Sequence, residues 1–97
     1  MTDTPHLTDQ QREALDRMRG HLDAALACLD EIRDPVEREL AARVMTDDLL
    51  PAAEGRAKAV RTKVVQQLRT ERGLKLREVA DLIGLSIPRV DQLAKGK

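Results

Sequence analysis

The apolar residues of this chain recur at intervals of three and four, and no stretch alternates with the period of two that is typical of a strand. Residues spaced by three or four lie on one face of an α-helix. The clearest such stripe predicts a helix over about residues 9–33 and contains Leu15, Met18, Leu22, Ala25, Leu29 and Ile32, with Leu26 widening it. The sequence therefore predicts an all-α fold.

Two capping signals define the first pair of predicted helices. Thr8 and Gln11 have the spacing of a capping box, in which each side chain bonds the backbone of the other residue. Asp34 is a second N-cap candidate, and Pro35 follows it at the first helical position, where its missing N–H is harmless. Because so few residues separate the two helices, we expect them to fold back as an antiparallel hairpin.

A third helix is predicted from about Pro51 to Arg72. Pro51 disfavours a helical conformation at the preceding residue and so ends or kinks the second helix, while Gly73 stops the third as a left-handed cap. Its buried stripe is expected to be Ala53, Ala57, Val60, Val64 and Leu68. The same helix is densely basic, with Arg56, Lys58, Arg61, Lys63, Arg69 and Arg72.

Charge divides the chain although its net charge is zero. Residues 1–54 hold 13 acidic and 6 basic side chains, a net of −7, whereas residues 55–97 hold 4 acidic and 11 basic, a net of +7. The positive half suits phosphate, although two solvated helical regions of opposite sign would give the same split. We therefore expect an acidic hairpin (residues 1–50), a basic connecting helix (51–73) and a functional C-terminal segment (74–97).

Composition excludes several classes of protein. The chain has no Phe, Tyr or Trp, so it lacks the aromatic platforms on which single-strand and RNA-binding modules stack bases. No apolar stretch approaches the roughly 18–20 residues that cross a bilayer, and no secretory signal is present, which predicts a soluble, cytoplasmic protein. His21 and Cys28 lie too far apart along one helix to share a metal ion. We expect no enzyme activity, no cofactor and no metal.

Residues 76–95 carry the strongest local pattern. Ala80 is a small residue and Gly84, four positions later, suits a turn between two crossing helices; Ser86 then caps the second helix. Lys75 stands where a Ser or Thr cap is usual, which predicts a frayed start for the first helix. The remaining packing positions are apolar, namely Val79, Ile83, Leu85, Val90 and Leu93.

This segment resembles the bacterial helix-turn-helix family. The likeness rests on E-V-A-x-x-I-G-L-S followed by x-x-R-V-x-Q-L over residues 78–93, about a fifth of the chain. It is similar above all to region four of sigma factors and to short actinobacterial helix-turn-helix regulators. The resemblance implies a fold of about five helices, in which the hairpin and the connecting helix precede a C-terminal helix-turn-helix.

The resemblance also implies which residues meet double-stranded DNA. Residues 86–95 would form the recognition helix in the major groove. The residues expected to contact bases are Ser86, Ile87, Arg89 and Gln92. Arg89 would bind guanine or brace a phosphate, Gln92 would pair with adenine, and Ile87 would meet a thymine methyl group. Ser86, at the start of the helix, would also favour a phosphate. The candidate phosphate contacts are Arg72, Lys75, Arg77, Lys95 and Lys97.

The stripe of the first helix has two interpretations, and so does the role of the chain. A dimer interface or an intrachain core would each explain Leu15, Met18, Leu22, Leu26 and Leu29; the small chain and the usual two-fold use of the motif favour a homodimer. We expect a sequence-specific transcriptional regulator. The alternatives are a protein-interaction module that binds RNA polymerase or an anti-sigma-type partner, and a sequence-neutral nucleoid protein.

Overall fold

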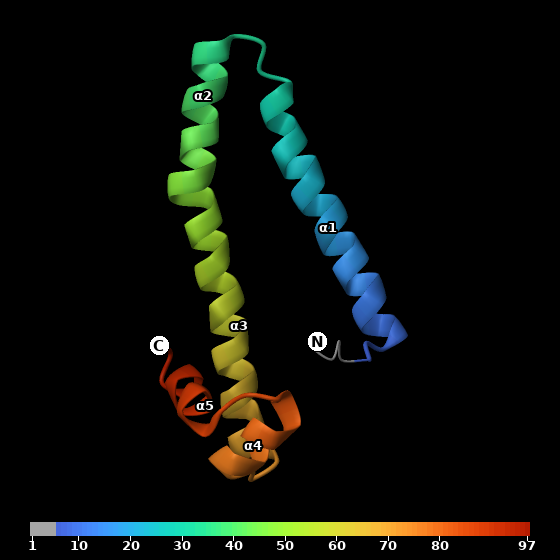
Figure 1. Ribbon diagram of the computed structural model, residues 1–97, viewed down its shortest axis with the longest axis vertical. Coiled ribbons are helices and arrows are strands. Elements are labelled where there is room, and N and C mark those ends of the chain that lie inside the picture. Colours follow the sequence, from blue (N-terminus) through green and yellow to red (C-terminus); the bar gives the residue numbers. More distant parts are fainter. Residues whose placement is uncertain (1–5) are drawn as a thin grey trace. The chain divides into compact units, whose positions relative to one another are not determined.

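The computed structural model describes residues 6–97 and contains helices but no strand over that range (Figure 1). Residues 1–5 of the predicted acidic region lie outside the described residues. The chain divides into two compact units between Met45 and Thr46, and each unit is described by itself. In residues 6–97, no helix is both long enough and apolar enough to span a membrane.

The first unit contains α1 (Asp9–Asp30) and α2 (Pro35–Val44). The predicted capping box is confirmed, because the Gln11 backbone N–H donates to Thr8 Oγ1 over 3.1 Å and the Thr8 N–H donates to Gln11 Oε1 over 2.7 Å. Helix α1 ends three residues before the predicted residue 33.

Helix α2 begins where the sequence predicts it. The carboxylate of Asp34 accepts a hydrogen bond of 2.9 Å from the Glu37 backbone N–H, and Pro35 is the first helical residue. The chain reverses direction between α1 and α2, as a helical hairpin does (Figure 1). The α-helical part ends at Val44, and the rest of the predicted helix, up to Leu49, is a π-helical turn.

A π-helical turn, η1 (Met45–Leu49), separates α2 from α3 (Leu50–Glu71). Pro51 lies in the first turn of α3, directly after the π-helical turn. At the other end Arg72 is the C-cap, and Gly73 has a positive φ of 64°. The predicted third helix and its glycine stop are therefore confirmed to within one residue.

The second unit packs α4 (Leu76–Ile83) and α5 (Ile87–Ala94) against the C-terminal part of α3 (Figure 1). Its core is purely aliphatic, and every core side chain is at most 5% exposed: Val65, Val79, Ala80, Val90 and Leu93. Five apolar residues pack around it in half-buried positions: Leu68, Leu74, Leu76, Leu85 and Ala94.

The predicted buried stripe of α3 is mostly wrong. Val60 is 62% exposed and Val64 is 43% exposed, and Ala53 and Ala57 are exposed as well. The residue of α3 that enters the core is instead Val65. Helices α4 and α5 pack against the C-terminal part of α3. The apolar residues nearer the start of α3 therefore have no neighbouring helix in this unit that could bury them.

Candidate functional site

Helices α4 and α5 are joined by a tight turn at Gly84. This residue has φ 70° and ψ 35°, a left-handed conformation that glycine adopts without a steric penalty. The carbonyl of Ala80 accepts hydrogen bonds from the N–H groups of Gly84 (2.9 Å) and Leu85 (3.1 Å), and these bonds close the last turn of α4. The chain is extended at Ser86 and enters α5 at Ile87, so three residues separate the two helices.

The inner face of α5 is fixed by burial and by its cap. Val90 and Leu93 are fully buried, and Ser86 Oγ accepts a hydrogen bond of 3.2 Å from the Arg89 N–H. Across α3, the side-chain amide of Gln66 donates to the Ala94 carbonyl over 3.0 Å. The first bond caps the start of α5, and the second joins its last residue to α3.

Two local predictions for this segment need correction. Helix α4 does have a cap at its start, because the Glu78 carboxylate accepts a hydrogen bond of 3.1 Å from the Lys75 backbone N–H. The frayed start expected from the side chain of Lys75 is wrong, because Glu78, three residues on, accepts the hydrogen bond of the Lys75 N–H. Ile83, a predicted packing position, is exposed rather than buried.

The outer surface of α5 carries the residues predicted to contact bases. Ser86, Ile87 and Gln92 are exposed, whereas Arg89 is half-buried. Arg89 Nη1 donates to Gln92 Oε1 over 3.3 Å, one helical turn away. The structure therefore brings these two predicted DNA-reading side chains together on one side of the helix.

The predicted phosphate contacts fall into two places. Arg72, Lys75 and Arg77 lie at the connection between α3 and α4 and in the first turn of α4, and all are exposed. Lys95 lies at the end of α5 and pairs with Asp91, with 2.8 Å between its Nζ and Asp91 Oδ2. The last residue, Lys97, donates its backbone N–H to the Gln92 carbonyl over 2.9 Å.

The sequence did not predict that Arg89 lies near basic residues of α3. Its side chain lines a hollow of about 240 Å³ together with Lys58 and Arg61, and the remaining lining residues are Glu54 and Ala57 of α3. The sequence showed that α3 is basic, and Lys58 and Arg61 have the three-residue spacing of one helical face. Only the crossing of α5 over α3 shows that this face meets Arg89.

The predicted dimerisation residues of α1 are mostly open to solvent within the described chain. Leu15 and Leu29 are half-buried, while Met18 and Leu22 are each 55% exposed and Leu26 is 46% exposed. Three large apolar side chains of one stripe are thus left largely without cover.

No protein family, curated protein or solved structure matches this chain in the three comparisons made. What the site does is therefore argued from its own geometry. Over residues 6–97 no three His, Cys, Asp or Glu side chains are grouped so that they could hold a metal ion.

Proposed function

We propose that this chain is a homodimeric, sequence-specific regulator that binds double-stranded DNA, with α4, the Gly84 turn and α5 acting as a helix-turn-helix. In this proposal α5 is the recognition helix and lies in the major groove. Ser86, Ile87 and Gln92 contact base edges, Arg89 contacts guanine or a phosphate, and five basic residues contact the backbone: Arg72, Lys75, Arg77, Lys95 and Lys97.

The observation that carries the proposal is the division of α5 into two faces. Val90 and Leu93 are buried against the core, which holds the helix rigidly, while Ile87 and Gln92 stay exposed on its other sides. Ile87, the first residue of this packed helix, is 45% exposed. A rigid helix with polar and apolar side chains facing outward is what direct readout of a groove requires.

Charge supports the same assignment. Residues 46–97 contain 11 basic and 7 acidic side chains, a net of +4, and residues 1–45 contain 6 basic and 10 acidic, a net of −4. A positive unit attracts the phosphate backbone and a negative one is repelled by it. Electrostatic attraction therefore brings duplex DNA to the unit that contains α5.

The exposed stripe of α1 supports a homodimer. Met18 and Leu22 occupy heptad positions on a helix of 22 residues, and Leu26 lies beside them; a second copy of the same helix would bury all three. A two-fold dimer presents two recognition helices to successive major grooves, so we expect half-sites about one helical turn apart.

The decisive experiment is selection from a pool of random duplexes, followed by fluorescence anisotropy on the recovered and on shuffled sequences at several salt concentrations. We expect tighter binding to the recovered duplex and an affinity that falls steeply with salt. Gln92→Ala should weaken binding to the recovered duplex by about 1–3 kcal/mol and relax discrimination.

Each alternative has its own signature in that experiment. Equal affinity for the recovered and shuffled duplexes would indicate a sequence-neutral nucleoid protein instead. No binding to any duplex at low salt would overturn the proposal and favour a protein-interaction module for RNA polymerase or an anti-sigma-type partner.

The dimer is tested separately by sedimentation equilibrium. Leu22→Glu places a charge in the exposed apolar stripe and should shift the chain to monomer. Ala24→Glu adds the same charge to α1 about 200° around the helix from Leu22, and should leave the dimer intact. A wild-type chain that sediments as a monomer would overturn the dimer but not the DNA-binding proposal.

A further inference from the structure

Three basic side chains from two helices share one hollow of the second unit. Lys58 and Arg61 come from α3, Arg89 comes from α5, and the only acidic residue that lines the hollow is Glu54. The hollow thus carries a net charge of about +2, which an anion in that space would balance.

These three cations also lack acidic partners. In residues 6–97 the ion pairs join Arg19 to Asp16, Arg43 to Glu39 and Lys95 to Asp91, and none involves a cation of the hollow. The hydrogen bond of Arg89 goes to the neutral amide of Gln92. Three like charges therefore lie near one another, and Glu54 is the single acidic residue that lines the hollow with them.

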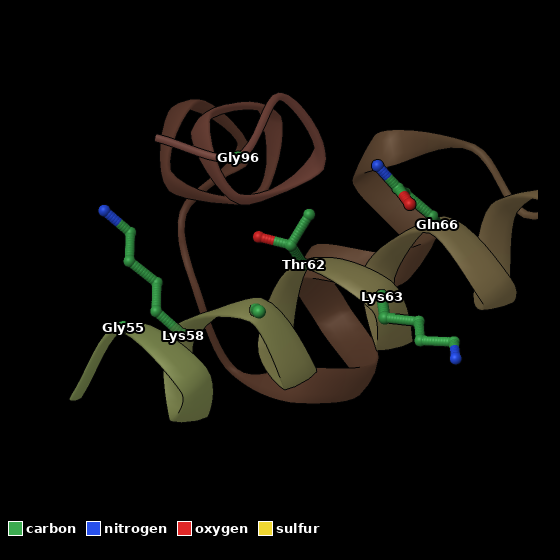
Figure 2. Close-up of a pocket in the computed structure, with 7 residues that line it drawn as sticks. Gly55, Lys58, Thr62, Lys63, Gln66 and Gly96 are labelled. Carbon is green, nitrogen blue, oxygen red and sulfur yellow. The ribbon is translucent and has the colours of Figure 1, made fainter. Parts of the chain in front are cut away.

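Lys58 lines a second hollow as well as the one it shares with Arg89. This second hollow has a volume of about 610 Å³, and Gly96 reaches it from the chain end that follows α5. In Figure 2, Lys58 and Lys63 stand toward opposite ends of this second hollow, with Thr62 between them. Lys58 therefore lies beside α5 both near Arg89 at its start and near Gly96 beyond its end.

Groove dimensions place the DNA backbone at this edge. The major groove is about 12 Å wide, so a helix inside it is flanked by phosphates on both sides. Packed helices lie about 8–10 Å apart, so a helix packed against the recognition helix runs close to one of those phosphate rows. Basic side chains at the junction of α3 and α5 are then within reach of a phosphate.

We infer that Lys58 and Arg61 of α3, together with Arg89 of α5, bind a phosphate of the DNA backbone beside the recognition helix. This inference rests on the proposed function and deepens it. It selects phosphate rather than guanine for Arg89, so base discrimination falls to Ser86, Ile87 and Gln92. Glu54 weakens the site, because its carboxylate repels the same phosphate.

The test uses anisotropy of the full-length chain with a selected and a shuffled duplex across salt. Lys58→Gln and Arg61→Gln should each lower the slope of log affinity against log salt by about 1, and should weaken both duplexes by the same factor. Arg89→Gln should do likewise. Glu54→Gln should instead tighten binding to both duplexes, a gain that a purely structural role would not produce.

Arg56→Gln is the matched control. Arg56 lies on the same helix but about 200° around it from Lys58, and its loss should leave the salt slope unchanged. Lys58 and Arg61 are exposed, so circular dichroism spectra of their variants should match the wild type.

The outcomes separate this inference from the proposed function. If the wild type binds no duplex, the proposed function fails. If the wild type binds and the Lys58→Gln/Arg61→Gln double variant keeps its affinity and salt slope, this inference alone is wrong. A loss confined to the selected duplex in Arg89→Gln would return Arg89 to base readout.

Discussion

The turn at Gly84 gives the sharpest prediction about stability. Gly84→Ala places a side chain on a residue with φ 70° and ψ 35°, where an L-residue pays about 1–2 kcal/mol. A Cβ built at this position meets no heavy atom within 4 Å, so no steric clash adds to that cost. We therefore expect Gly84→Ala to destabilise the second unit by about 1–2 kcal/mol, through backbone conformation alone.

The measurement should report on the second unit only, because a chain of two units need not unfold in a single step. Native-state hydrogen exchange at the amides of Val79, Val90 and Leu93 meets this need, since all three residues are buried in that core. Gly84→Asn is the companion variant. Asparagine tolerates the left-handed region better than alanine does, so it should lose less stability despite its larger side chain.

Three results would refute this reasoning. A loss in Gly84→Asn equal to or larger than that in Gly84→Ala would show that size, not conformation, sets the cost. A loss above about 4 kcal/mol in Gly84→Ala would indicate a steric conflict at the turn. No loss at all would mean that the turn does not need a left-handed residue.

Three further predictions concern α5 and its surroundings. Leu93→Ala should destabilise the second unit by about 2–5 kcal/mol because Leu93 is 1% exposed, whereas Leu82→Ala, at a site that is 63% exposed, should change stability by less than about 0.5 kcal/mol in the same exchange experiment. Ser86→Ala removes the cap of α5 and should cost about 1 kcal/mol, measured by urea unfolding; an unchanged midpoint would contradict the cap's role. Asp91→Asn removes an acidic side chain from α5 and frees Lys95, so it should tighten duplex binding in anisotropy; weaker binding would contradict it.

Local features of the fold could be predicted from the sequence because their causes are local. The caps at Thr8 and Asp34 and the turn at Gly84 each depend on neighbours within four positions. The start of α4 was predicted wrongly although its cause is also local. It is capped by Glu78, three residues after Lys75, whereas the prediction rested on the side chain of Lys75 alone.

Features that depend on how helices cross could not be predicted. The spacing of Val60 and Val64 is as good a helical stripe as that of any buried face, yet the residue that enters the core is Val65. The outcome depends on the direction from which α4 and α5 approach α3, which the periodicity of α3 does not encode. The same crossing brings Lys58 and Arg61 to Arg89, across 28 residues or more of chain.

The intrahelical pairs of α5 raise the question of whether its outer surface is free to bind. Arg89 donates to Gln92 over 3.3 Å, and Lys95 pairs with Asp91 over 2.8 Å. A hydrogen bond of this kind contributes a net of about 0.5–1.5 kcal/mol, and an exposed ion pair about 0.2–1 kcal/mol. A good base contact contributes about 1–3 kcal/mol of discrimination. The free energy lost when these pairs break is therefore of the same size as that gained from the DNA contacts that replace them, so the pairs do not prevent the outer surface of α5 from binding a duplex.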